Sequence, residues 1–182
     1  MKKITFIIAT ILLVSCNTIT SPVNEKPNPN ARDGFGSLSE KPSNSWGYRS
    51  YIQYYDDYIS IHWLNEIPNS DLPELQEIFK KADVMAQYIY DNITIDIERK
   101  DVGKFKGETI GLSYDYSTET LRIGIVYCDN YIMDACSFGN KNEFQKEGGF
   151  TSYLTTKRDL YFKRLNDYNR MSEENQNKLD NL

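Results

Sequence analysis

The strongest constraint on the fold is a strict alternation of apolar and polar residues on both sides of one short polar segment, residues 117–120. Alternation with a period of two is typical of a strand that buries one face, and two such strands around a short connection predict an antiparallel hairpin. Pairing Tyr116 with Leu121 puts the apolar residues on one face and sets Asp115 opposite Arg122, an opposite-charge pair that favours this register. The alternating apolar residues are Ile110, Leu112, Tyr114 and Tyr116, then Leu121, Ile123, Ile125 and Tyr127.

A further hairpin is predicted earlier in the chain. Two stretches rich in Tyr, Ile and Trp, residues 48–55 and 58–64, are separated only by Asp56 and Asp57. Setting Tyr55 opposite Tyr58 sorts the side chains into two faces, because successive residues of a strand point to opposite sides. The expected core face holds Ile52, Tyr54, Ile59, Ile61 and Trp63, and the opposite face holds Tyr51, Gln53, Tyr55, Tyr58, Ser60 and His62.

Helical spacing of apolar residues predicts two helices. Asp71 is suited to cap the first one, with Pro73 and Glu74 in its first turn. Its apolar stripe is Leu72, Leu75, Phe79, Ala82, Ala86, Ile89 and Tyr90. A second stripe, Leu154, Tyr161, Leu165 and Tyr168, predicts a helix from about residue 151. Beyond Met171 the chain is nearly all polar and is expected to fray.

Between the first helix and the last hairpin, Ile93, Ile95 and Ile97 alternate with polar residues. This predicts a half-buried strand that ends near Lys100, with a polar turn over residues 103–107. The predicted order is strand, strand, helix, three strands, helix. It favours an α+β fold with a mainly antiparallel sheet of about five strands, β-β-α-β-β-β-α, and helices packed on the sheet. One domain is expected over residues 46–170, with a polar tail over 171–182.

The amino terminus has the pattern of an export signal. Two lysines, Lys2 and Lys3, precede an apolar run over residues 4–14, which is too short to span a bilayer as a helix. The segment Leu13-Val14-Ser15-Cys16 resembles the lipobox of bacterial lipoproteins. This resemblance covers the first sixteen residues only and implies cleavage after residue 15 and lipidation of Cys16. The alternative is an ordinary secretory signal with an incidental cysteine, although residues 13–15 lack an Ala-x-Ala-like pattern.

The resemblance also implies a place in the cell. A chain with two or three acyl groups on Cys16 is held durably on a membrane of the bacterial cell envelope. Asn17, which is not Asp, favours the outer membrane by resemblance to the enterobacterial sorting pattern. Residues 17–45 contain four of the six prolines and almost no apolar residue, so residues 16–45 are expected to be a lipidated cysteine and flexible tether.

The charge and the remaining cysteines constrain the partners. Without the two lysines of residues 1–15, 19 basic side chains stand against 26 acidic ones, a net charge of −7 that gives no general attraction for nucleic acid. Cys128 and Cys136 are an even pair in an exported chain and predict a disulfide. Metal binding by this pair is the weaker alternative, because the only histidine, His62, is far away in sequence.

The sequence carries no recognisable catalytic, cofactor or metal motif. Asp96 and Glu98 fall on one side of the predicted strand, about 7 Å apart at Cβ, which suits paired-carboxylate hydrolysis. His62 is the side chain expected to titrate near neutrality. The simpler interpretation of these residues is a solvated strand face and a surface histidine.

The tyrosine-rich face of the first hairpin is the preferred binding surface. Tyr51, Tyr55, Tyr58 and His62 present large rigid rings with polar tips, suited to contact with a protein, peptide or glycan. The alternative is that the carboxy-terminal helix covers this face and makes it core. The sequence therefore favours a non-catalytic envelope binding module, such as an adaptor, an inhibitor or an immunity-type protein, without a cofactor. The competing hypothesis is a small envelope hydrolase using His62 or the Asp96 and Glu98 pair.

Overall fold

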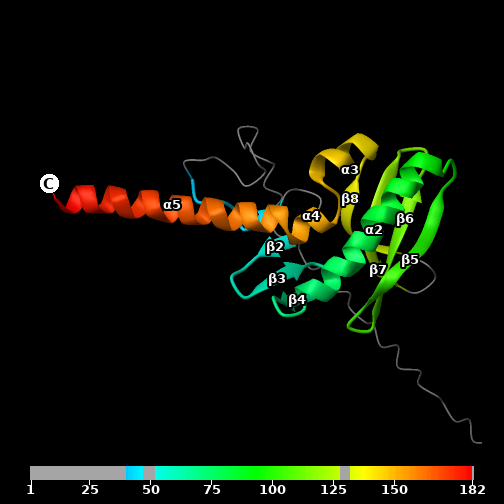
Figure 1. The fold of residues 1–182 in the computed structure, drawn as a ribbon, viewed down its shortest axis with the longest axis horizontal. Coiled ribbons are helices and arrows are strands. Elements are labelled where there is room, and N and C mark those ends of the chain that lie inside the picture. The colour runs from blue at the N-terminus through cyan, green and yellow to red at the C-terminus, as the bar shows by residue number, and fades with distance from the viewer. Residues whose placement is uncertain (1–39, 47–51, 128–131, 182) are drawn as a thin grey trace, which may run out of the picture.

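The fold is α+β and contains two antiparallel sheets joined by one long helix (Figure 1). The computed structural model describes residues 40–46, 52–127 and 132–181. Sheet A has the order β1-β2-β3-β4 and sheet B the order β5-β6-β7-β8. The strands of sheet A are β1 (Ser45–Trp46), β2 (Ile52–Tyr54), β3 (Tyr58–Ile61) and β4 (Asn65–Pro68). Those of sheet B are β5 (Ile97–Phe105), β6 (Glu108–Asp115), β7 (Thr120–Val126) and β8 (Ile132–Phe138).

The first predicted helix is confirmed as α2 (Leu72–Asn92), which packs on sheet B and shares one hydrophobic core with sheet A. Every predicted stripe residue from Leu72 to Ile89 is buried, and Tyr90 is half-buried. The expected cap bond is absent. The Asp71 carboxylate instead forms an ion pair with Lys106 at 2.6 Å, across the turn that joins β5 to β6.

The first hairpin forms in the predicted register. Ile52 pairs with Ile61, Gln53 with Ser60 and Tyr54 with Ile59, while the backbone N–H of Tyr55 donates to the carbonyl of Tyr58 at 3.0 Å. All five residues of the predicted core face are buried: Ile52, Tyr54, Ile59, Ile61 and Trp63. Tyr51 and its predicted pairing with His62 lie outside the described residues.

The second hairpin has the predicted faces but a register that differs by two residues. Tyr114, not Tyr116, lies opposite Leu121, and Ser113, not Asp115, lies opposite Arg122. The cause is the Asp115 side chain, whose carboxylate accepts hydrogen bonds from the Ser117 hydroxyl and the Thr118 backbone N–H. These bonds fold residues 116–119 into the turn, so Tyr116 is exposed. A shift of two preserves the side-chain parity. Most of the predicted face is therefore buried, whereas Tyr116 and Tyr127 are exposed.

The predicted single sheet of about five strands is wrong. The structure adds β1, β4 and β8 and divides the strands between two sheets. The strand expected over residues 93–100 begins only at Ile97, so Ile95 is exposed, and it continues through the expected polar turn to Phe105. Two register shifts interrupt β5, and its charged side chains conceal the alternation. Lys106 (φ 49°) and Gly107 (φ 89°) then close a two-residue turn of the kind that requires positive φ at both central positions.

The carboxy-terminal part is helical, as predicted, but has three elements. They are α3 (Lys141–Glu147), α4 (Thr151–Leu154) and α5 (Thr156–Asp180). The ring of Tyr161 in α5 stacks on Tyr54 at 5.7 Å, and the Tyr54 hydroxyl donates to the carbonyl of Tyr153. The expected fraying after Met171 is not observed, since α5 continues to Asp180 and projects away from the body (Figure 1).

Candidate functional site

The outer face of sheet A is defined here as the side opposite its buried core face. It carries Gln53, Tyr55, Tyr58, Ser60 and Glu66. The first four are half-buried and Glu66 is exposed. Helix α5 packs against Tyr54, which points to the other side of the sheet. The carboxy-terminal helix also passes close to the turn of this hairpin, because Asp56 and Tyr55 help to raise the pKa of Tyr161, after the larger effect of its burial.

Two tyrosines form the centre of this face. The rings of Tyr55 and Tyr58 stack with centroids 4.4 Å apart and planes 14° from parallel. The Tyr55 hydroxyl donates to the Gln53 side-chain carbonyl at 3.1 Å. Partial burial raises the pKa of the Tyr58 hydroxyl, and the Glu66 carboxylate and Tyr55 raise it further. The Tyr58 phenol therefore stays neutral at physiological pH, and the two stacked rings present one aromatic surface with polar rims.

The turn that carries these rings is held from outside the hairpin. The Asn69 side chain donates to the Asp56 carbonyl at 2.7 Å, and the Asn69 backbone N–H donates to the Asp57 carbonyl at 3.0 Å. Arg158 of α5 in turn donates to the Asn69 side-chain carbonyl at 2.9 Å. The turn is thus tied to α5 through a single asparagine, and this fixes the position of the rings relative to the core.

The predicted four-residue site is only partly assembled. The structure brings Tyr55 and Tyr58 together, while Tyr51 lies outside the described residues. His62 is exposed in the turn between β3 and β4, at the far end of β3 and about 13 Å from Tyr58 at 3.3 Å per strand residue. Sequence reasoning missed Glu66, because Asn65–Pro68 has a single buried residue and shows no alternation.

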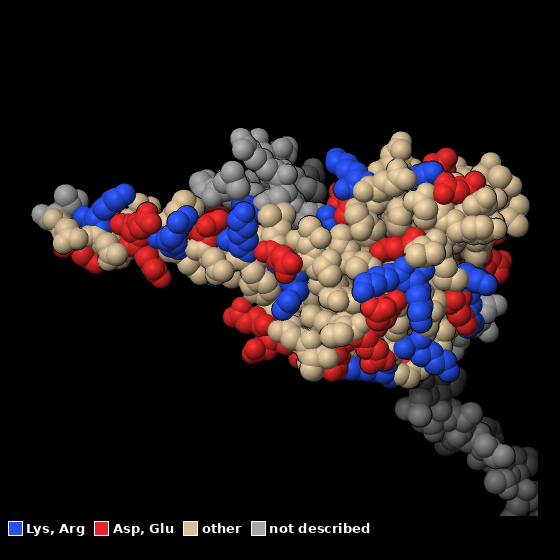
Figure 2. Space-filling model, viewed as in Figure 1, with Lys and Arg blue, Asp and Glu red and all other residues tan. Residues whose placement is uncertain are grey.

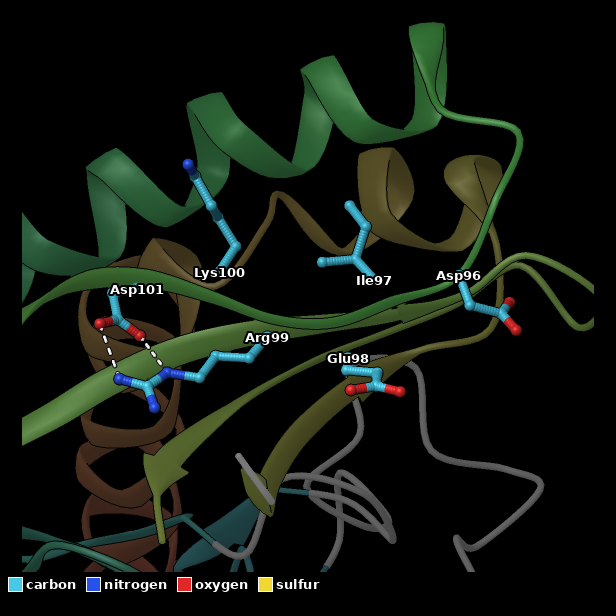
Figure 3. A pocket seen from close by; sticks show the side chains of 6 residues that line it. All are labelled: Asp96, Ile97, Glu98, Arg99, Lys100 and Asp101. Carbon is cyan, nitrogen blue, oxygen red and sulfur yellow. Dashed lines mark hydrogen bonds and ion pairs between the residues drawn. The ribbon is translucent and has the colours of Figure 1, made fainter. Parts of the chain in front are cut away.

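The carboxylate pair proposed for hydrolysis does not form. Asp96 precedes β5, and its carboxylate accepts the backbone N–H of Tyr116 at 2.8 Å, which secures the β6–β7 turn. Figure 3 shows that the carboxylates of Asp96 and Glu98 do not converge; the groove beside them is shallow and holds an internal ion pair of Arg99 with Asp101. Among the described residues, no group of three or more His, Cys, Asp or Glu side chains is placed to hold a metal ion.

The covalent features predicted from the sequence fall largely outside the described residues. Cys16 and Cys128 both lie outside the described residues. Cys136 lies in β8, and its backbone pairs with Ile123 of β7. No helix within residues 40–46, 52–127 and 132–181 has the length and apolar character needed to span a membrane. No family model, no curated protein and no solved structure matches this chain.

Proposed function

We propose that this protein is a lipid-anchored binding module of the bacterial cell envelope, and that it recognises a partner protein through Tyr55 and Tyr58. The observation that carries the proposal is the stacked, half-buried ring pair on the outer face of sheet A, opposite the side on which α5 packs against Tyr54. Tyrosines that are rigid and partly exposed offer a large contact area with little loss of side-chain entropy on binding.

The charges around the ring pair indicate the chemistry of the partner. Asp56 and Asp57 are exposed in the turn between the two tyrosines, and Glu66 lies beside Tyr58. An aromatic face bordered by carboxylates attracts a lysine or arginine side chain, because the cation interacts with both the ring and the acids. A basic segment of an envelope or secreted protein fits this surface better than an acidic ligand.

The anchor and tether proposed from the sequence suit such a role. Lipidation of Cys16 would hold the chain on the membrane, and the tether would let the domain search for a partner. Ser45 belongs to β1 and Pro42 is buried, so the expected tether is shortened to residues 17–39, and a flexible chain of that length has a root-mean-square span of about 25 Å. This distance is comparable with the diameter of a small domain, so the ring pair would reach partners beside the membrane surface.

The test uses the full-length protein in its own membrane. A photo-reactive phenylalanine analogue in place of Tyr58 is expected to cross-link one partner with a basic contact segment. Tyr55→Ala should weaken recovery of that partner by about tenfold or more, as truncation of a central aromatic residue does. Tyr116→Ala and Tyr127→Ala are matched controls, since both rings are exposed elsewhere on sheet B. The proposal is contradicted if a Tyr55→Ala, Tyr58→Ala double variant recovers as much of the partner as the unmodified protein does. It is also contradicted if the cross-linked product is a glycan and not a protein.

A further inference from the structure

The outer face of sheet A carries its side chains in two rows that run across the strands. The register places Tyr55, Tyr58 and Pro68 in one row, and Gln53, Ser60 and Glu66 in the next. The rings of Tyr55 and Tyr58 lie 4.4 Å apart, close to the spacing of about 4.8 Å between neighbouring strands, so they stack along the row. One face of the Tyr58 ring is therefore covered by Tyr55. The other face is turned toward β4, where Glu66 and Pro68 are exposed.

The Glu66 carboxylate lies at the edge of that ring face. Glu66 is the diagonal neighbour of Tyr58 on the same side of the sheet, and after the larger effect of burial it helps to raise the pKa of the Tyr58 hydroxyl. Glu66 forms no ion pair with any residue in the described part of the chain. Arg158, which braces the nearby turn, is held by Asn69 and lies over the Phe162 ring at 5.3 Å. The Glu66 carboxylate therefore suits a cation supplied by another molecule.

The ring face and the carboxylate together fit a guanidinium better than an ammonium. A guanidinium is planar, so it can lie flat on the Tyr58 ring while its N–H groups donate to the Glu66 carboxylate in two parallel hydrogen bonds. The ammonium of lysine is a compact, strongly hydrated charge without this planar geometry. Figure 2 shows acidic side chains at the end of the β2–β3 hairpin, where Asp56 and Asp57 are exposed. Their charge attracts either kind of cation, so a preference for one kind depends on Tyr58 and Glu66.

We infer that the outer face of sheet A contains a slot for one arginine side chain of the partner protein, formed by the open face of the Tyr58 ring and bordered by Glu66 and Pro68. The inference rests on the proposed binding role of Tyr55 and Tyr58 and narrows it. The contact segment of the partner contains an arginine that lysine does not replace. Tyr58 supplies the surface on which the guanidinium stacks, and Glu66 selects its planar pair of donors. Tyr55 supports the slot by packing behind the Tyr58 ring.

The experiment uses the full-length protein in nanodiscs of phosphatidylcholine, whose headgroups have no net charge. Two probes are compared by surface plasmon resonance against empty nanodiscs: an acetylated and amidated Gly-Ser-Ala-Arg-Ala-Ser-Gly peptide, and the same peptide with lysine in place of arginine. The arginine peptide should bind about fivefold more tightly, as one exposed stacking contact and one charge-assisted contact would give. Glu66→Gln, a change that keeps size and polarity, should reduce this ratio to about one. Tyr58→Ala should do the same, whereas Tyr58→Phe retains the ring and should keep most of the preference.

Two controls separate the slot from general attraction. Asp57→Asn should weaken the binding of both peptides by the same factor and leave their ratio unchanged, because its charge acts on any cation. Glu98→Gln, at an exposed carboxylate of sheet B, should change neither affinity. Glu66 and Glu98 are both exposed, so thermal melts of the two Gln variants should match that of the unmodified protein.

The arginine slot is overturned if the unmodified protein binds both peptides equally, if it binds neither, or if the arginine preference survives Glu66→Gln. These results leave the proposed function standing when photo-cross-linking through position 58 still yields a partner protein with a basic contact segment. If the cross-link also yields no protein, the slot and the proposed function both fail.

Discussion

The carboxylate of Asp83, on α2, accepts the backbone N–H of Phe150 at 2.6 Å and that of Thr151 at 3.0 Å. One side chain thus accepts hydrogen bonds from two backbone N–H groups at the start of α4. These donors lie 67 and 68 residues after Asp83 in the chain. Gly149 makes this approach possible, because a Cβ atom at that position would lie 2.6 Å from the Asp83 carboxylate. The contact joins α2 to the segment that leads into α5.

Removing the Asp83 carboxylate should destabilise the domain. Asp83→Ala leaves two partly buried N–H groups without an acceptor, at a cost of about 2 to 4 kcal/mol in the free energy of unfolding. Asp83→Asn should cost less, because its carbonyl still accepts one of the two bonds. Asp91→Ala on the exposed side of the same helix is the control. Urea melts of the three variants decide this, and equal losses for Ala at positions 83 and 91 would contradict the assignment.

The same carboxylate should make stability depend on pH. Burial raises the pKa of Asp83 above its ordinary value of 3.8, and the bonds from Thr151 and Phe150 only partly offset this. The folded state then binds more protons than the unfolded state just above pH 3.8, so the contribution of Asp83 to stability falls as the pH rises through the folded pKa. Melts at a series of pH values should show the stability of the unmodified chain falling relative to Asp83→Asn above pH 3.8. A constant difference would exclude a raised pKa.

Much of the fold was predictable because its signals are local. The core face from Ile52 to Trp63 and the buried stripe of α2 follow from periods of two and 3.6 residues. Strands β4 and β8 were missed because they lack clean alternation, and β8 contains a register shift opposite Ile123 and Gly124. The division into two sheets was not predictable either, since it depends on how α2 packs on strands far apart in sequence.

The candidate site shows the same division between local and distant information. The Tyr55 and Tyr58 pair follows from a two-residue turn, so its register could be written down from the sequence. The bracing of that turn by Asn69 and Arg158 joins segments 89 residues apart, and no periodic pattern reports such a contact. For the same reason the sequence did not show that Asp96 is engaged by the backbone of Tyr116.

Stacking of Tyr55 on Tyr58 should be measurable as a coupling energy. Each ring is half-buried, so each single change to Ala is expected to cost about 1 kcal/mol, well below the 3 to 5 kcal/mol of a core aromatic residue. A double-mutant cycle should give a favourable coupling of about 0.5 to 1.5 kcal/mol. Tyr55→Ala with Tyr116→Ala is the control pair and should be additive. Coupling of zero in the Tyr55 and Tyr58 cycle would mean that the rings do not stack in solution.

Two sequence predictions about cysteine chemistry can be checked on the full chain. Cys16→Ser should abolish labelling by a fatty-acid probe, because the thiol is the expected acylation site; continued labelling would contradict the lipoprotein assignment.

A disulfide between Cys128 and Cys136 should appear in non-reducing peptide maps of the natively purified protein. It would contribute about 2 to 3 kcal/mol by closing a short loop. Two free thiols in that map would exclude it.

The turn between β5 and β6 provides a final test, one that separates backbone conformation from packing. Gly107 has φ of 89°, and no atom lies within 4 Å of a Cβ atom built there, so a side chain has room but the wrong backbone conformation. Gly107→Ala should therefore lower the free energy of unfolding by about 1 to 2 kcal/mol. Gly107→Asn should cost less although its side chain is larger, because asparagine tolerates positive φ.

Gly103 is the matched control, because the cause of its expected loss is different. Its φ is not positive, but a Cβ atom there would lie 3.2 Å from Ile78 of α2, so Gly103→Ala should strain the packing of α2 on β5. Truncating the neighbour in a Gly103→Ala, Ile78→Val double variant should recover part of that loss, whereas Ile78→Val should not rescue Gly107→Ala. Urea melts of the five variants are the measurement. An Asn variant less stable than the Ala variant at position 107 would show that this turn does not require the left-handed conformation.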